Sequence, residues 1–75
     1  MKRYDLRHLK KEFENRMFEI VNSSQKDETL IFLFEIINEE ELQKLLRDIE
    51  EKGHEVLNSL RFNEVDWTII IRAKG

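Results

Sequence analysis

The chain has 75 residues, of which 39% are charged, and its formal net charge is −3 at neutral pH. This length predicts one domain, residues 1–75, and the absence of Cys excludes disulfides and thiolate metal sites. The two His residues lack metal-ligand spacing, so no metal or other cofactor is expected. The longest apolar run, Leu30 to Phe34, is too short to cross a bilayer. We therefore expect a cytoplasmic protein, and its composition, rich in Lys and Glu, is typical of heat-adapted proteins.

The first element, Tyr4 to Arg7, fits either a short strand or the start of a helix. As a strand it would place Tyr4 and Leu6 on one face, but Leu6 also fits the helical stripe that follows. That stripe recurs at intervals of three and four and predicts a helix; its members are Leu9, Phe13, Met17, Ile20 and Val21. We predict the strand, because a helix that joins two parallel strands forms the β-α-β unit.

The middle of the chain predicts a buried strand followed by a second helix. Leu30 to Ile37 is β-rich with almost no polar alternation, which is typical of a central strand covered on both faces. Asn38 is a candidate N-cap, with Glu41 three residues on, and Gly53 is placed to end the helix. The helical stripe consists of Leu42, Leu45, Leu46 and Ile49.

The end of the chain predicts two strands, Val56 to Phe62 and Val65 to Ala73, joined as an antiparallel hairpin by a short link. The element order is then β-α-β-α-β-β. We predict an α/β protein of the two-layer α+β sandwich type, in which a four-stranded mixed sheet carries two helices on one face.

Four segments together resemble the TusA/SirA-like sulfur-carrier family. Tyr4 to Arg7 resembles the family's aliphatic-Asp-Leu-Arg strand, and Asp27 to Leu30 resembles its Gly-Glu-x-Leu entry into the second strand. Gly53 to Leu57 looks like its Gly-His-Glu-aliphatic step, and Trp67 to Gly75 looks like its last strand and basic tail. The resemblance covers nearly the whole chain and implies the same fold.

The departures from this family fall at its reactive site. His8 stands where the family has Gly, Lys11 where it has the sulfur-carrying Cys, and Glu12 where it has Pro. The family's chemistry needs a thiolate at a helix N-terminus, and Lys cannot carry a persulfide. The resemblance therefore implies the fold without the activity, and we expect no catalytic residues and no enzyme.

A basic group at this helix entrance is a candidate anion site, made of Arg7, His8, Lys10 and Lys11. Free backbone amides at a helix N-terminus attract anions, and nearby cations add to this. The alternative is a solvated basic surface left after the loss of the Cys. Nucleic acid is not expected as a partner, because the overall charge is acidic and no aromatic residues alternate with the basic ones.

The apolar second strand predicts an interface, since two helices cover only one face of a four-stranded sheet. Either its even-numbered or its odd-numbered apolar residues lie on the open face; the alternative is shielding by long side chains such as Arg61, Arg72 and Lys74. Exposed apolar surface of this kind usually marks an interface, for a homodimer or a protein partner. The candidate residues are Ile31, Phe32, Leu33, Phe34 and Ile70.

Other residues have simpler interpretations. We expect His54 to be a capping or surface residue, Trp67 to lie in the core, and Glu39 to Glu41 to form a solvated helix face. The leading function is a non-catalytic binding or interaction module without persulfide transfer of its own. The alternatives are an anion or small-ligand binder near Lys11, or an accessory partner in sulfur relay.

Overall fold

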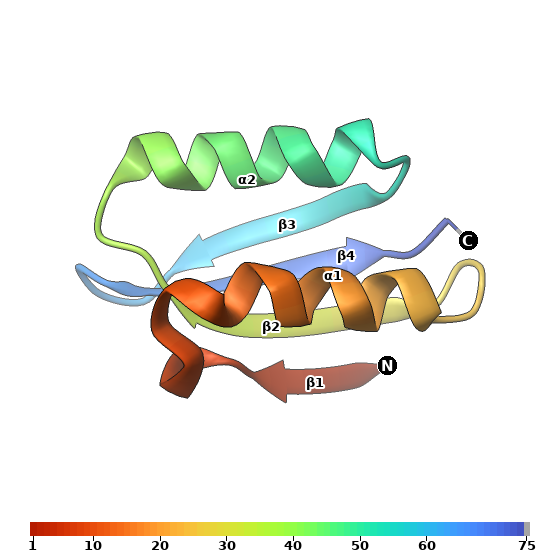
Figure 1. The fold of residues 1–75 in the computed structure, drawn as a ribbon, viewed down its shortest axis with the longest axis horizontal. Coiled ribbons are helices and arrows are strands. Elements are labelled where there is room, and N and C mark those ends of the chain that lie inside the picture. Colours follow the sequence, from red (N-terminus) through yellow and green to blue (C-terminus); the bar gives the residue numbers. More distant parts are fainter. Residues whose placement is uncertain (75) are drawn as a thin grey trace.

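The computed structural model describes residues 1–74. Figure 1 shows strands and helices that follow one another along the chain. In chain order they are β1 (Lys2–Asp5), the 3-10 helix η1 (Arg7–Glu12), α1 (Phe13–Ser23), β2 (Thr29–Glu35), α2 (Glu39–Glu51), β3 (Glu55–Arg61) and β4 (Asp66–Arg72). None of these helices combines the length and hydropathy needed to span a membrane.

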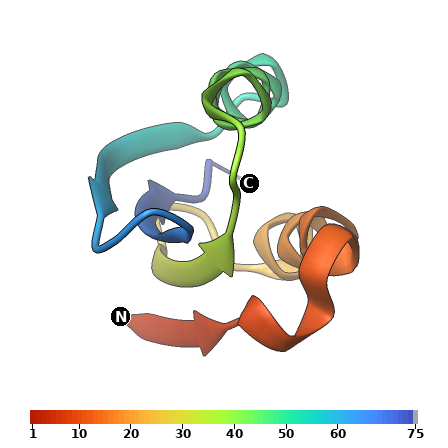
Figure 2. The same cartoon turned by 90° about the vertical axis from the view of Figure 1, so that its left-hand side faces the viewer.

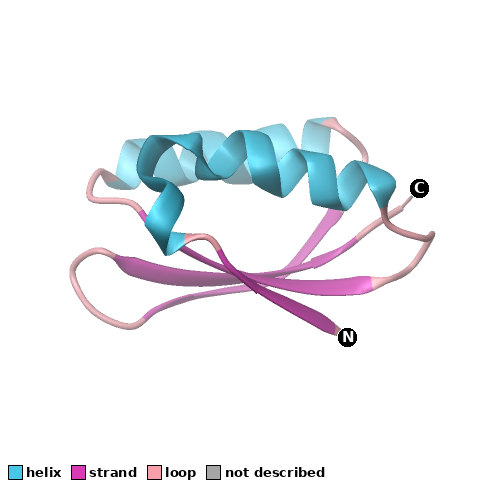
Figure 3. Ribbon diagram, turned by 60° about the horizontal axis from the view of Figure 1, so that its bottom comes forward, coloured by secondary structure: helices cyan, strands magenta, loops and turns pink. Residues whose placement is uncertain are grey.

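The four strands form one mixed sheet in the order β1-β2-β4-β3. β1 and β2, which α1 connects, pair in parallel, whereas β4 lies antiparallel between β2 and β3. Both helices lie on the same face of the sheet, as the end-on view of Figure 2 and the side view of Figure 3 show. The predicted order and two-layer α+β architecture are thus confirmed.

The second helix begins and ends as its sequence predicts. The Oδ1 atom of Asn38 accepts a hydrogen bond of 2.8 Å from the backbone N–H of Glu40, which satisfies one free amide of the first turn. At the other end, Gly53 has φ 89°, and the N–H of His54 reaches back to the carbonyl of Ile49 at 3.2 Å. This left-handed residue reverses the chain into β3.

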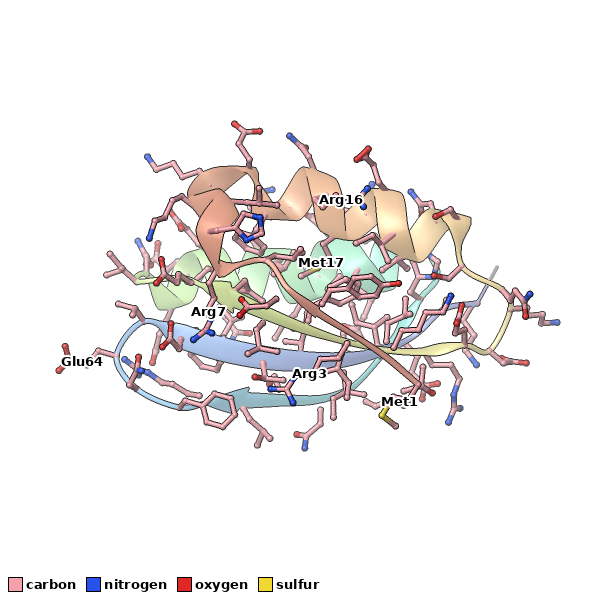
Figure 4. The ribbon with its side chains drawn as sticks, turned by 90° about the horizontal axis from the view of Figure 1, so that it is seen from below. Met1, Arg3, Arg7, Arg16, Met17 and Glu64 are labelled. Atoms are coloured by element: carbon pink, nitrogen blue, oxygen red, sulfur yellow. The ribbon has the colours of Figure 1, made fainter. Side chains whose placement is uncertain are left out.

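The core lies between the helices and the sheet. Figure 4 shows Met17 between α1 and the strands, and its side chain is fully buried. The rings of Phe13 on α1 and Phe34 on β2 stack with centroids 4.7 Å apart. The fully buried core residues from the sheet are Leu30, Phe32, Phe34, Ile69 and Ile71. The face of β2 that carries Phe32 and Phe34 is therefore the helix-covered face.

Two element boundaries differ from the sequence prediction. The first strand covers Lys2–Asp5 instead of Tyr4 to Arg7, and six residues of 3-10 helix separate it from α1. β2 ends at Glu35, so Ile37, predicted to be its last residue, lies in the following loop and is 83% exposed. Periodicity could not reveal these ends, because apolar residues continue past each one.

Candidate functional site

The predicted anion site lies where β1 turns into the helical layer. The N–H of Leu6 donates to the carbonyl of Leu33 at 2.8 Å, which extends the pairing of β1 with β2 by one residue. Leu6 is buried, so it anchors the turn and leaves the following residues, from Arg7 onward, at the end of the sheet. The local order of strand, turn and helix is as predicted, although η1 stands between the turn and α1.

Arg7 is held by carboxylates of its own chain. Asp5 accepts hydrogen bonds from Nε and Nη2 of Arg7 at 2.9 and 2.7 Å, and from its backbone N–H at 3.1 Å. These bonds to the Arg7 side chain and backbone lower the pKa of Asp5 to about 2. Asp66 lies 3.8 Å from Nη1 of the same guanidinium. Arg7 is thus already paired at the place where an anion would have to compete.

Lys10 is also engaged, in an unusual backbone conformation. Its Nζ lies 2.7 Å from Oε1 of Glu35, at the end of β2. Its φ and ψ are 52° and −124°, a region that favours glycine and costs on the order of 1–3 kcal/mol for other residues. The carbonyl of Lys10 accepts from the N–H of Phe13, so η1 uses one of the amides that the anion-site prediction requires to be free.

His8 and Lys11 are exposed on the surface of η1. Among residues 1–74, no carboxylate lies within ion-pair distance of Lys11. The structure therefore separates the four predicted ligand residues into two paired cations, Arg7 and Lys10, and two side chains that face solvent.

Two cavities adjoin this entrance. A shallow one of about 520 Å³ is lined by Asp5, Arg7, His8, Lys10, Glu35 and Asp66. It brings together three of the predicted residues, but its three carboxylates make it a poor anion site.

The second cavity, of about 660 Å³, opens between η1 and the start of α2 and has an apolar floor with a charged rim. The floor consists of Phe13, Ile36, Ile37 and Val65, and the basic rim residues are Lys10, Lys11 and Lys44. Glu14, Glu35 and Glu41 lie on the same rim, and burial raises the pKa of Glu14. Sequence reasoning missed this cavity, because its walls come from segments that are distant along the chain.

The second candidate surface is the sheet face that the helices leave open. Side chains on this face form rows across the sheet, which the strand register defines. The two central rows are Arg3, Ile31, Ile70 and Asn58, followed by Asp5, Leu33, Thr68 and Leu60. Beyond them lie Thr29, Arg72 and Glu55 at one end, and Glu35 and Asp66 at the other.

The centre of the open face is apolar. Ile31 and Ile70 are half-buried, Leu60 is 46% exposed, and Leu33 is only 7% exposed because its neighbours cover it. Charged residues frame this centre on β1 and β4. Figure 4 shows Arg3 on the side of the sheet away from α1, and Arg3 has no ion-pair partner among the described residues.

Thr68 lies in the middle of this face, and its hydroxyl is unusual. Its Oγ1 atom is buried and has no hydrogen-bond partner among the described residues. A buried polar atom without a partner costs on the order of 1–3 kcal/mol. The open face therefore contains a local defect at its centre.

The five predicted interface residues divide between the two faces. Phe32 and Phe34 are fully buried beneath the helices, so they belong to the core and offer no surface in the folded chain. Ile31, Leu33 and Ile70 lie on the open face, where Leu60 and Arg3 join them from the neighbouring strands. The sequence could not choose between the faces, since both sides of β2 are apolar.

Two other residues differ from their predicted places. His54, expected at the surface, is 8% exposed and contacts both Asn22 and the backbone of Lys74. Trp67 is only half-buried, and the Arg61 guanidinium lies 5.7 Å from its ring centroid. Arg61 therefore covers the helix side of the sheet and does not shield the open face. Within residues 1–74, no group of three or more acidic or His side chains could hold a metal ion.

The comparisons with known proteins point to one family. The family described as a putative E-chain of NADH-ubiquinone oxidoreductase matches residues 1–73. A solution structure of HP1264 from Helicobacter pylori is similar over 100% of both chains, with 47% sequence identity and a TM-score of 0.73. No curated protein matches the chain. Neither match points to the TusA/SirA-like sulfur carriers, despite the short motifs. The protein belongs to the NADH-ubiquinone oxidoreductase E-chain family.

Proposed function

We propose that this protein is a non-catalytic interaction subunit that binds another protein chain through its open sheet face. The observation that carries the proposal is the apolar centre of that face, where Ile31, Ile70 and Leu60 remain accessible without a covering layer. Surface of this kind is typical of protein interfaces. A small domain also gains stability when a partner covers such surface.

The family name gives the proposal a context. The matching family is described as one component of NADH-ubiquinone oxidoreductase, so we propose that the partners include other components of such an enzyme. The 75 residues contain no Cys, so they supply no thiolate for an iron–sulfur cluster and no sulfur atom for persulfide transfer. On this proposal the protein contributes contacts and shape to an assembly located in the cytoplasm or at its boundary.

The test is affinity capture from the cells in which the protein occurs. The tagged wild-type chain is expected to recover components of NADH-ubiquinone oxidoreductase, whereas Ile70→Glu, which places a charge in the open face, is expected to lose them. Ile37→Glu is the matched control, because Ile37 is an exposed apolar residue outside the sheet. Equal recovery by the Ile70 and Ile37 variants would refute binding through the open face.

A second candidate function is favoured by the larger cavity beside η1. Its apolar floor and its three lysines fit a small anionic molecule with an apolar part. Phosphate, sulfate and nucleotides, titrated against the labelled protein, would shift the amide resonances of residues 8–13 on this hypothesis. The shifts should weaken in Lys11→Glu and persist in Lys26→Glu, since Lys26 lies in the loop between α1 and β2. Silent amides throughout this segment would exclude the site.

The accessory role in sulfur relay rests on the motif resemblance alone and stays a weaker prediction. The same capture experiment tests it, because a sulfur-trafficking protein would then be among those recovered. Recovery of no such protein would remove this role.

A further inference from the structure

The charges on the open face are arranged so that the face is complementary to itself. On β1, Arg3 and Asp5 lie two residues apart and point to the same face. On β4, Arg72 and Asp66 lie at opposite ends of the strand, also on the open face. Each of these two strands therefore carries a basic residue toward one end of the face and an acidic residue toward the other.

We propose that a second copy of this chain covers the open face, related to the first by a two-fold axis that crosses the strands between the two central rows. This inference deepens the proposed function and rests on it, because it names one partner for the same surface. A rotation about this axis places each strand over the same strand of the second copy, in the opposite direction. Each row then faces the row with which the axis exchanges it.

The resulting contacts join unlike charges and bury apolar groups. Arg3 faces Asp5 of the second copy, and Arg72 faces Asp66 of the second copy, each twice by symmetry. Ile31 faces Leu33, and Ile70 faces Thr68, in the centre. Packed sheets lie about 10 Å apart and rotate by about 30°, so the long arginine side chains at the rim bridge the offset.

A two-fold axis parallel to the strands, between β2 and β4, is less favourable. Each row would then face itself, so Asp66 would lie over Glu35 of the second copy, twice by symmetry. Arg3 would lie over Asn58 and gain no carboxylate partner. Like charges directly opposed across an interface cost several kcal/mol, in rough terms. The charge pattern therefore selects the axis that crosses the strands.

The charged partners are only partly satisfied within one chain. Arg3 has no ion-pair partner among the described residues. Arg72 lies 3.3 Å from Glu55, and Asp66 lies 3.8 Å from Arg7. These exposed pairs can extend into small networks across the interface without first being broken.

Sedimentation over micromolar to millimolar concentrations, together with a charge exchange, tests the inference. The wild-type chain is expected to form dimers, and Arg3→Asp is expected to weaken them by about tenfold or more, since symmetry repeats the repulsion. Asp5→Arg should weaken them likewise. An equimolar mixture of the two variants should recover association, because each like-charge contact then becomes an opposite-charge contact.

Arg16→Asp is the matched control, since Arg16 lies on the outer surface of α1, away from the sheet, as Figure 4 shows. It carries the same charge change and should leave the dimer unaffected. Circular dichroism checks the fold of each variant. If Asp5→Arg fails to fold because it loses its contacts with Arg7, Arg3→Asp alone still decides the point.

Methyl resonances locate the contact independently. Those of Ile31 and Ile70 should shift with concentration in the wild-type chain, while that of Ile37 should not. A monomeric wild-type chain, a dimer indifferent to Arg3→Asp, or shifts confined to Ile37 would each overturn the inference.

The outcomes separate this inference from the proposed function. A monomeric wild-type chain whose capture of other proteins is lost in Ile70→Glu refutes the second copy and leaves the proposed function standing. A dimer with the expected charge dependence, but with capture unchanged in Ile70→Glu, supports the second copy and refutes binding of other proteins through this face.

Discussion

Protonation of His54 is expected to destabilise the fold, because the structure holds this ring neutral. Its Nδ1 atom accepts a hydrogen bond from the backbone N–H of Lys74 at 3.1 Å. The ring proton therefore sits on Nε2, which lies 3.2 Å from Oδ1 of Asn22 and donates to it. A second proton would have to enter on Nδ1, where it would face the N–H of Lys74. Protonation thus breaks the contact between the start of β3 and the residues that follow β4.

The magnitude follows from the pKa of the ring. Burial, and then the positive charge of Lys52, lower the pKa of His54 below its ordinary value of 6.5. The unfolded chain therefore binds this proton at a higher pH than the folded chain does. The free energy of unfolding keeps its full value above pH 6.5 and decreases as the pH falls from 6.5 to the lowered pKa.

Within this window the loss is at most about 1.4 kcal/mol per pH unit. A domain of this size has a total stability of about 4–11 kcal/mol, so the loss is measurable.

Urea unfolding of the wild-type chain and of His54→Gln, between about pH 5.5 and pH 8, measures this effect. The wild-type free energy of unfolding should fall toward the acid end, whereas that of the variant should stay nearly level. The pKa of Asp5, about 2, lies below the window. Burial raises the pKa of Glu14, so any contribution from Glu14 would increase stability as the pH falls, opposite to His54.

The ring resonances of His54 provide a direct check, with those of His8, the exposed imidazole, as an internal comparison. His54 should titrate at lower pH than an unfolded peptide that contains the same sequence. An equal acid slope in the wild-type chain and His54→Gln, or a His54 ring that titrates as in the peptide, would refute the reasoning.

Three further predictions test single features of the fold by urea unfolding. Thr68→Val removes the buried hydroxyl without a partner and keeps the side-chain shape, so stability should stay level or rise by up to about 1–2 kcal/mol; a clear loss would reveal a missed partner. Gly53→Ala should cost about 1–2 kcal/mol, because φ is 89° and no atom lies within 4 Å of the added methyl; an unchanged midpoint would contradict this. Asn38→Ala should cost about 1 kcal/mol through loss of the cap on Glu40, and Asn38→Asp should retain most of the stability.

The fold was predictable because its signals are local and agree with one another. The cap at Asn38, the stop at Gly53 and the helical stripes each depend on residues within a few positions. The first strand needed a different argument. Leu6 fits both a strand and a helix, and only the requirement for a β-α-β unit selected the strand. That requirement decides the existence of a strand but not its ends, which explains the shift to Lys2–Asp5.

The site was less predictable because its parts are distant in sequence. His54 contacts Asn22 and Lys74, which lie 32 and 20 positions away. The faces of β2 could be assigned only once the helices were in place, since Phe32 and Leu33 are equally apolar. The anion-site prediction counted Arg7 as a free cation, yet Asp5, two residues earlier, holds it. Alternation places such neighbours on the same side of a strand, and that signal could have been used.

The two candidate functions are physically connected through one ion pair. Glu35 ends β2, lines both cavities, and belongs to the acidic end of the open face. Its partner Lys10 lines both cavities as well and holds a strained backbone conformation while it makes this contact. An anion that recruited Lys10 would release the Glu35 carboxylate and make the acidic end of the open face more negative. Since that end would face the basic end of a second copy, an anion at the entrance would strengthen the contact between the two copies.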